Sequence, residues 1–417
     1  MPKRVLIVGG GVIGLSTAYY CIRKGHSVTV VDRNSPERDG CSFGNAGMIV
    51  PSHFVPLAAP GMVALGLKWM WNPESPFWIK PRLSWDLLSW ATKFWRASSR
   101  EHVARSAPLL RDLNLASRGC YEELVESSGL DFGLVKRGLL VLCKTEHALE
   151  EEIKLAGEAR KLGMPAEVLD PRALASFDPG VQLDVLGGIH YPKDCHLSPD
   201  RLMAELKREL ERLGAEFVWN AEALGWSTRA GVIEAVRTSR GDFPTDEVVL
   251  ASGAWSPATA RDLGLKLPMQ AGKGYSLTLP SPRQLPKTCA LLVEARVAVT
   301  PMGSSLRFGG TMEIAGLNDE INLARVRGIS RAATRYFPAL LESDFASVKP
   351  WRGLRPCTPD GLPYLGRPGR ISNLVVATGH AMMGLSLGPI TGKLASELVS
   401  GEPPSIDIAL LSPDRYR

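Results

Sequence analysis

Arg4-Val5-Leu6-Ile7-Val8-Gly9-Gly10-Gly11-Val12-Ile13-Gly14 is the stretch that decides the fold of this chain. Its first five residues form an apolar run typical of a buried parallel strand, and the glycines that follow make a GxGxxG pattern before a helical periodicity over residues 12–24. A second β-branched run over residues 27–31 ends at Asp32. Strand, glycines, helix, strand and acid in this order predict a βαβ unit that binds a dinucleotide.

The residue types in this unit suit that chemistry. Gly9 permits a tight turn, Gly11 lets the backbone approach a pyrophosphate, and Gly14 lets the helix and strand pack closely. Amide groups at the helix start face the phosphates, and the Asp32 carboxylate accepts a hydrogen bond from a ribose. The residues predicted to contact the cofactor here are Gly9, Gly11, Val12, Ile13, Gly14, Asp32 and Arg33.

Composition excludes several classes of function. The net charge of +6 is spread along the chain rather than gathered in a basic block, which disfavours nucleic acid as a partner. The 7 cysteines are scattered, without a CxxC pair or metal-ligand spacing, so we expect buried thiols in a reducing compartment and no metal. The apolar run over 5–8 is too short for a secretory signal, and no stretch reaches the roughly 18–20 apolar residues of a spanning helix. We therefore expect a cytoplasmic protein, with peripheral attachment to the inner membrane left open.

Two later segments favour FAD over NAD. Each is a buried strand that runs into a small-residue turn, at 248–255 and at 373–380, and the second precedes a helical pattern over 388–399. A return of the chain to the nucleotide-binding sheet would point the N-terminus of that helix at the isoalloxazine ring, where its dipole stabilises negative charge on the reduced flavin.

With these segments the chain resembles the D-amino-acid oxidase superfamily of FAD-dependent oxidoreductases, and within it the bacterial D-amino-acid dehydrogenases. The resemblance runs nearly end to end, through VLIVGGGVIGLSTAYY at 5–20, CSFGNAGMIVP at 41–51, AAPGMVALGLKWM at 58–70, GKGYSLTLP at 272–280, RFGGTMEIAG at 307–316, WRGLRPCTPDGLPYLG at 351–366 and ATGHAMMGLSLGPITG at 377–392.

The resemblance implies further contacts to a non-covalently bound FAD. They are the flavin-wrapping residues Ser42, Asn45, Ala46, Gly47 and Met48, the adenine-side residue Ala223, the second glycine turn with Ser252, Gly253 and Trp255, and the loop beneath the flavin with Gly379, His380, Met383, Gly384, Leu385 and Ser386.

The resemblance also implies that Arg355 clamps a substrate carboxylate, a role that suits a guanidinium because it donates two parallel hydrogen bonds. A structural ion pair is the alternative for this residue. His53, Tyr275 and Met382 are further candidates for the substrate pocket, although His53 and Tyr275 could equally be structural. Arg307 stands where sarcosine-type oxidases place a lysine near the flavin, which argues against rapid reduction of oxygen.

Residues 57–95 combine tryptophan with lysine and arginine, at Trp69, Trp71, Trp78, Trp85, Trp90 and Trp95. Such a segment suits a bilayer interface, where it would bring the flavin near a membrane quinone. Trp85, Trp90 and Phe94 also lie near helical spacing and could pack in the core. Both interpretations stay open.

The sequence therefore predicts an α/β fold, α+β overall. A Rossmann-like FAD-binding domain (1–85, 198–268, 352–417) interleaves with a substrate domain on a mixed or antiparallel sheet (86–197, 269–351). The expected activity is oxidative deamination of D-amino acids to 2-oxo acids and ammonia, with electrons passed to a quinone or an artificial dye. The alternatives are a D-proline or hydroxy-D-proline dehydrogenase, a glycine- or sarcosine-type oxidase, and a non-catalytic membrane-associated flavoprotein.

Overall fold

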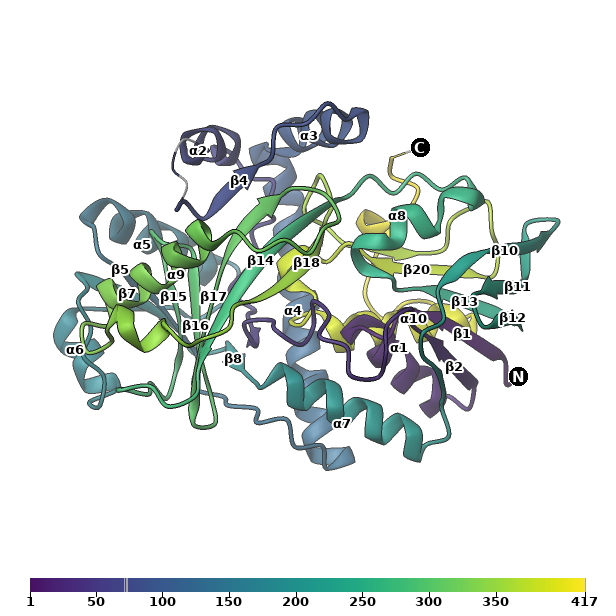
Figure 1. Ribbon diagram of the computed structural model, residues 1–417, viewed down its shortest axis with the longest axis horizontal. Coiled ribbons are helices and arrows are strands. Elements are labelled where there is room, and N and C mark those ends of the chain that lie inside the picture. The colour runs from purple at the N-terminus through teal and green to yellow at the C-terminus, as the bar shows by residue number, and fades with distance from the viewer. Residues whose placement is uncertain (71, 73, 417) are drawn as a thin grey trace.

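The computed structural model describes all residues except 71, 73 and 417, and it contains a mostly parallel sheet beside a larger mixed sheet (Figure 1). The parallel sheet has the order β19 (Tyr364–Gly366), β20 (Leu374–Thr378), β13 (Glu247–Leu250), β1 (Arg4–Val8), β2 (Ser27–Val31) and β9 (Glu216–Val218). Only β19 is antiparallel to its neighbour. Strand β1 lies at the centre, with Val5 opposite Val28 on one side and Glu247 on the other.

Alternate residues of β1 enter different cores because successive side chains of a strand point to opposite faces. Val5 and Ile7 pack against α1 (Val12–Arg23), α4 (Arg100–Ser128), α7 (Pro199–Arg212) and α10 (Gly388–Ser400). Leu6 and Val8 pack toward a small antiparallel sheet of β10 (Ala223–Arg229), β11 (Val232–Thr238) and β12 (Gly241–Pro244). The predicted Rossmann-like arrangement is confirmed.

The larger sheet runs in the order β18 (Trp351–Cys357), β14 (Gln270–Leu279), β17 (Ser305–Ile314), β16 (Val297–Met302), β15 (Cys289–Leu292), β5 (Leu139–Cys143), β7 (Gly187–Tyr191) and β6 (Glu167–Leu169), and β4 (Phe77–Ile79) also pairs with β17. Its β15–β5 and β17–β4 pairs are parallel and the others antiparallel, so the predicted mixed sheet is confirmed. Helices α5 (Glu146–Lys161), α6 (Pro171–Phe177) and α9 (Leu323–Tyr336) accompany it (Figure 1).

Two strands of the larger sheet come from segments predicted to belong to the FAD-binding domain. Strand β4 lies within 1–85, and β18 lies within 352–417 apart from its first residue, Trp351, yet both hydrogen-bond in the larger sheet. After β18 the chain crosses between the sheets at the 358–361 turn, where Gly361 has φ +76°. The domain limits stay a prediction. The pairing of β18 favours placing the last limit after the 358–361 turn instead of at residue 352.

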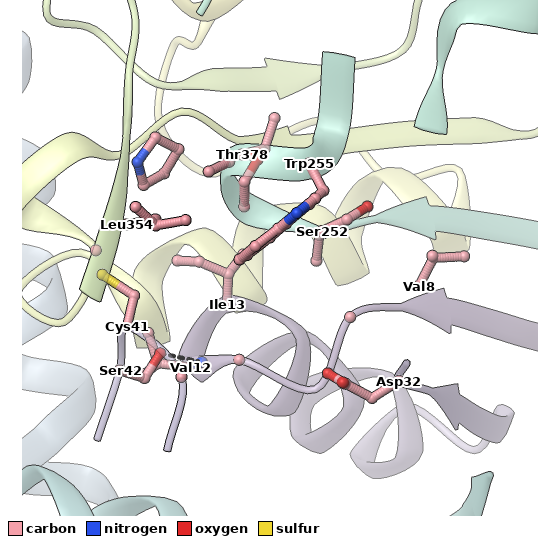
Figure 2. Close-up of a pocket in the computed structure, with 18 of the residues that line it drawn as sticks. Val8, Val12, Ile13, Asp32, Cys41, Ser42, Ser252, Trp255, Leu354 and Thr378 are labelled. Carbon is pink, nitrogen blue, oxygen red and sulfur yellow. Dashed lines mark hydrogen bonds between the residues drawn. The ribbon is translucent and has the colours of Figure 1, made fainter. Parts of the chain in front are cut away.

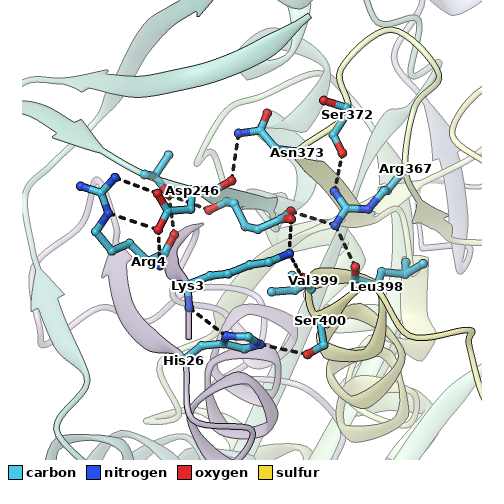
Figure 3. Close-up of polar contacts among 12 residues, drawn as sticks. Lys3, Arg4, His26, Asp246, Arg367, Ser372, Asn373, Leu398, Val399 and Ser400 are labelled. Carbon is cyan, nitrogen blue, oxygen red and sulfur yellow. Dashed lines mark hydrogen bonds and ion pairs between the residues drawn. The ribbon is translucent and has the colours of Figure 1, made fainter. Parts of the chain in front are cut away.

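A polar cluster fastens the base of the parallel sheet (Figure 3). Buried Glu247 of β13 forms ion pairs of 2.8 Å with Lys3 and with Arg367. The Lys3 ammonium also donates to the carbonyl of Val399 in α10, and His26 contacts the Ser400 hydroxyl at 2.9 Å. This cluster joins Lys3, directly before β1, to β13 and α10.

The tryptophan-rich segment divides between core and surface. It forms α2 (Met62–Trp69), β4 and α3 (Trp85–Ala97), and the two helices lie together at the top of Figure 1. Trp90 is buried, and its indole donates to the Cys357 carbonyl at 2.9 Å. Trp85 and Trp95 are 86% and 65% exposed. Core packing therefore holds for Trp90 and not for Trp85, while Trp71 lies outside the described residues.

All 7 cysteines are free thiols, and 6 of them are buried, Cys41 being half-buried. Among the described residues, no helix combines the length and the apolar character needed to cross a membrane.

Candidate active site

A first cavity of about 320 Å³ lies at the carboxyl ends of β1, β2, β13 and β20. Ligands of open parallel sheets bind at this edge. Figure 2 shows Val8 and Asp32 at one end of the cavity and Leu354 and Cys41 at the other.

The glycines at the start of α1 are required by close packing. A Cβ on Gly14 would lie 1.8 Å from the Gly9 carbonyl oxygen, and a Cβ on Gly9 would lie 2.5 Å from the carbonyl oxygen of Ala251. Gly9 also has φ +114°, which a side chain disfavours. At Gly11, which lines the cavity, a Cβ would meet only the Ser42 hydroxyl, at 3.5 Å. Gly9 and Gly14 therefore serve packing, and Gly11 leaves backbone open to a ligand.

Polar groups line the rest of this cavity. Asp32 is buried and accepts from the Gly10 amide at 2.7 Å, and the Val12 amide donates to the Ser42 hydroxyl at 3.0 Å (Figure 2). The buried hydroxyl of Ser252 has no protein partner among the described residues. Such a group normally finds a hydrogen-bond partner, so Ser252 is suited to a polar ligand.

A second cavity of about 480 Å³ adjoins the first, and Cys41 and Asn45 line both. Its wall is mostly apolar, with Met and aromatic side chains from α2, α3 and β4 among them. Its charged lining residues, within the described part of the chain, are Arg296 and Arg355, and no aspartate or glutamate lines it. The cavity is suited to a small anion that carries an apolar group.

Strand β18 forms the wall between the two cavities. Leu354 and Pro356 line the first cavity, whereas Gly353, Arg355 and Cys357 line the second, following the two-residue period of a strand. Arg355 is thereby held next to the first cavity while its guanidinium faces the second.

The Arg355 guanidinium has no carboxylate within ion-pair distance among the described residues, which rules out the structural ion pair there. It donates to the carbonyl of Thr311, and burial lowers its pKa from the ordinary value, although an arginine stays charged in any case. Thr311 sits in a β-bulge of the β14–β17 pair with φ +69°, a conformation costly for a residue with a side chain. The strain turns a carbonyl toward Arg355.

Gly274 makes room for the same guanidinium. A Cβ on Gly274 would lie 2.2 Å from one Arg355 Nη atom. The arginine therefore lies flat across the backbone of β14, with the rest of its donors available to a ligand.

Residues 4–398 match the family described as FAD dependent oxidoreductase, DAO. The chain belongs to this family. It is 34% identical over 418 residues to a D-amino acid dehydrogenase of Granulibacter bethesdensis, with 99% of each chain covered, and 31% identical to one of Rhizobium johnstonii, with 99% of this chain and 100% of the relative covered.

Solved structures agree with this assignment. Glycine oxidase from Geobacillus kaustophilus superposes with a TM-score of 0.79 at 25% identity, covering 100% of both chains. L-proline dehydrogenase from P. horikoshii superposes with a TM-score of 0.77 at 18% identity over 100% of this chain and 98% of the other, which shows the shared fold.

The residues of the first cavity fit the FAD of this oxidoreductase. Asp32 lies at the end suited to the ribose, Gly11, Val12 and Ile13 at the start of α1 line the cavity where they would hold a pyrophosphate, and the Ser252 hydroxyl, without a partner among the described residues, lines it as well. The Arg33 guanidinium stacks 3.8 Å from the ring centroid of Trp255, and both line the cavity. At the far end the cavity reaches β18, where the flavin of the oxidoreductase would face the substrate.

Most of the predicted site residues line one of the two cavities. The first cavity, called the cofactor cavity from here on, is lined by the predicted residues Gly9, Gly11, Val12, Ile13, Asp32, Arg33, Ser42, Asn45, Ala223, Ser252, Gly253, Trp255, Gly379, His380, Gly384 and Leu385. The second cavity, called the substrate cavity from here on, is lined by the predicted residues Asn45, Ala46, Met48, His53, Tyr275, Arg355, Met382, Met383 and Ser386.

Three predicted contact residues lie outside both linings: Gly14, Gly47 and Arg307. Gly47 has φ +77° and packs against the Leu197 carbonyl, where a Cβ would come within 2.3 Å. Arg307 donates to the carbonyls of Phe43 and Asn45 at 3.1 and 2.9 Å. In this oxidoreductase Arg307 therefore braces the segment that carries Ser42 and Asn45 instead of contacting the cavity.

The hydroxyl of Tyr275 is engaged within the protein. It donates to buried Glu313 at 2.9 Å and accepts from the Asn322 amide at 3.1 Å, so the ring lines the substrate cavity while its polar tip is used elsewhere. Met382 is 44% exposed and lines the same cavity. Cys357 is buried against Met312, and burial raises the pKa of its thiol to about 12, so it stays protonated.

Two arginines that line the cavities were missed by sequence reasoning. Arg38 lines the cofactor cavity and stacks on Trp219 at 4.3 Å, but it lies in an irregular stretch with no motif. Arg296 lines the substrate cavity from the β15–β16 turn. Its φ of +51° is unusual for an arginine, and sequence carries no signal for it.

Proposed function

We propose that this FAD-dependent oxidoreductase oxidises D-amino acids to 2-oxo acids and ammonia. The observation that carries the proposal is a half-buried guanidinium, Arg355, that has no carboxylate within ion-pair distance among the described residues and faces an apolar cavity adjoining the cofactor cavity. The names of the relatives at 34% and 31% identity support the D-amino acid as substrate.

Arg355 would bind the substrate carboxylate through two parallel hydrogen bonds, which fix the orientation of the α-carbon as well as its position. Because Leu354 and Pro356 of the same strand line the cofactor cavity, the α-hydrogen would be held at its edge. When bound, FAD supplies the acceptor for the hydride that leaves the α-carbon. The resulting iminium hydrolyses in water to the 2-oxo acid and ammonia.

The side chain of the substrate would lie among the apolar residues contributed by α2, α3 and β4. Methionine side chains adapt to different shapes, and Met62, Met70, Met312, Met382 and Met383 line this cavity. We expect larger apolar D-amino acids to be preferred over glycine and sarcosine.

Anaerobic bleaching of the flavin absorption tests the proposal. The holoenzyme is mixed with D-methionine, D-leucine, D-alanine, D-proline, glycine and sarcosine, and with the L-enantiomers as matched controls. Bleaching by D-enantiomers supports the proposal. Bleaching by L-enantiomers alone, or by none of the panel, overturns it, and the last result favours a non-catalytic flavoprotein.

A D-proline or hydroxy-D-proline dehydrogenase is the second candidate. The substrate cavity has no acidic lining residue in the described part of the chain, so nothing there selects a primary ammonium over a secondary amine. Preferential bleaching by D-proline in the same panel would favour it.

We further propose that the FAD is bound non-covalently, that a quinone is the electron acceptor, and that the protein attaches peripherally to the cytoplasmic face of the membrane. Exposed apolar residues on and before α3 support the attachment: Leu83, Trp85, Leu88 and Trp95.

Two measurements test the cofactor and acceptor proposals. Acid precipitation should release free FAD, and a water-soluble quinone analogue should reoxidise the reduced enzyme faster than oxygen does.

A further inference from the structure

A buried carboxyl group lies directly behind the wall of the substrate cavity. Asp194, in the turn between β7 and β8 (Cys195–His196), is fully buried. Its two oxygens accept from Ser52, one from the amide at 3.0 Å and one from the hydroxyl at 2.5 Å. Among the described residues it makes no ion pair. Burial raises the pKa of Asp194 to about 7 against the opposing effect of these hydrogen bonds. Both of its protonation states are therefore accessible near neutrality.

Ser52 connects this carboxyl group to the cavity. The Ser52 hydroxyl lies 3.2 Å from Nδ1 of His53, and His53 lines the substrate cavity. With Nδ1 engaged by Ser52, no protein partner of Nε2 is found among the described residues. Burial, with a smaller effect of Arg296, lowers the pKa of His53 to about 4, so its ring is neutral at physiological pH.

A serine hydroxyl has one proton, which restricts the direction of these bonds. When Asp194 is ionised, Ser52 donates to it and accepts from Nδ1–H of His53, which leaves a lone pair on Nε2. When Asp194 is protonated, it donates to Ser52, Ser52 donates to Nδ1, and the His53 proton sits on Nε2. The second arrangement holds one proton more than the first, and uptake of that proton at Nε2 of His53 moves the Nδ1 proton to Ser52 and the Ser52 proton to Asp194.

The charges around this chain favour removal of a proton from a bound substrate. An amino acid enters as a zwitterion, and its ammonium would meet the cations Arg355 and Arg296 with no acidic lining residue among those described. The groups that act on Asp194 from neighbouring elements are Arg118 of α4, Tyr191 of β7, Cys195 of β8 and Cys289 of β15. Burial raises the pKa of Tyr191 and of both thiols, so these three stay neutral and Arg118 is the charged member.

We propose that His53, Ser52 and Asp194 form a relay that deprotonates the substrate ammonium. The ammonium N–H proton passes to Nε2 of His53, the Nδ1 proton passes to the Ser52 oxygen, and the Ser52 hydroxyl proton passes to the Asp194 carboxylate. The amine lone pair that this frees is needed before the α-carbon can release a hydride. The inference rests on the proposed function, and it makes His53 a catalytic residue with Ser52 and Asp194 as its proton-accepting partners.

The rate of anaerobic flavin reduction by D-methionine, followed by stopped flow across pH, tests the relay. In the wild type the rate should rise through about pH 7, because protonated Asp194 cannot accept a proton. Asp194→Asn should remove this rise from the pH profile of the rate. It should also slow reduction near neutrality by about 10²-fold, the lower range for general acid–base catalysis. Ser52→Ala and His53→Gln should behave alike, and all three should recover at alkaline pH, where the free amine predominates.

His102→Gln is the matched control. His102 is also a buried histidine paired with a serine, Ser106, at 3.4 Å, but it lines neither cavity. Its pH profile should match the wild type. If Asp194 had a purely structural role, the rate of Asp194→Asn would still rise through about pH 7, and that result would overturn the relay.

A second readout does not depend on turnover. Nitrogen-15 NMR of histidine-labelled holoenzyme, with the His53 signal assigned by its loss in His53→Gln, should report the Nδ1–H tautomer above pH 7. In Asp194→Asn the amide NH₂ should donate to Ser52 and convert His53 to the Nε2–H tautomer. An unchanged tautomer would contradict the relay. Failure of every amino acid to bleach the wild-type flavin would instead contradict the proposed function, whatever the tautomer.

Discussion

At the scale of the residue, Arg355 depends on its neighbours for its geometry. The strained Thr311 carbonyl accepts one of its hydrogen bonds, and Gly274 leaves space for the guanidinium plane. Neither neighbour carries a charge, so the positive charge of Arg355 is left for a ligand. Two substitutions separate the charge from the geometry.

Arg355→Lys keeps the charge and loses the paired donors. The Michaelis constant for D-methionine should rise by roughly 10- to 150-fold, from the about 1.5–3 kcal/mol that a hydrogen bond to a charged group contributes. Arg352→Lys, on the same strand but paired with Asp319 at 2.9 Å, should change it little. Steady-state kinetics measures both, and equal effects would argue against the clamp.

Gly274→Ala keeps the arginine and displaces it. A methyl group at this position would overlap the guanidinium, so we expect weaker substrate binding with the FAD content unchanged. The ratio of flavin to protein absorbance and the Michaelis constant together check this expectation. Loss of FAD in parallel with loss of substrate affinity would contradict it.

At the scale of the element, the β1–α1 turn separates packing from ligand binding. Gly14→Ala drives a methyl group into the Gly9 carbonyl and should destabilise the protein even without FAD. Gly11→Ala meets only the Ser42 hydroxyl at 3.5 Å and should weaken FAD binding while the apoprotein keeps its melting temperature. Thermal unfolding of both apoproteins, with FAD titrations, distinguishes the two roles.

Helix α3 presents one face to the core and another to solvent. Trp90 stacks on Phe94 with ring centroids 5.1 Å apart, whereas Trp85, Leu88 and Trp95 are exposed. Trp85→Ser with Trp95→Ser should abolish co-flotation with phosphatidylglycerol vesicles and leave the reduction of flavin by D-methionine intact. Leu224→Ser, at an exposed apolar residue of β10, is the matched control. Flotation that survives the double change would reject the α3 face as the attachment site.

At the scale of the whole molecule, segments distant in sequence complete both sheets. The parallel sheet collects strands from residues 4–31, 216–218, 247–250 and 364–378, and the Glu247 cluster at its base ties Lys3 to Arg367 (Figure 3). Removing this carboxylate leaves two partly buried cations without their partner.

Glu247→Ala should lower the free energy of unfolding by roughly 2–4 kcal/mol, near the lower range for breaking a buried pair because both cations are partly solvated. Asp246→Asn, next in the chain and in an exposed pair with Arg4, should cost about 1 kcal/mol or less. Urea denaturation of the two apoproteins measures both values. Equal losses of unfolding free energy in the two variants would show that the burial of Glu247 adds nothing to stability.

The sequence by itself determined the βαβ unit, the later strands at 247–250 and 374–378, and the family. These features are local: glycine sterics act within a few residues, and a buried strand is an apolar run. The resemblance, block by block, also pointed to Arg355 and to other predicted site residues, most of which line one of the two cavities, since each block is a continuous segment.

Only the tertiary structure decided which side chains face which cavity and which meet across the fold. Arg307 braces the backbone of residues 43–45, and Asp194 reaches Ser52 across 142 positions of sequence. The core position of Trp90 and the exposure of Trp85 were likewise settled by the elements packed beside α3. Such contacts leave no periodicity or motif, because the partner of each group is supplied by a strand or turn that the chain reaches only on folding.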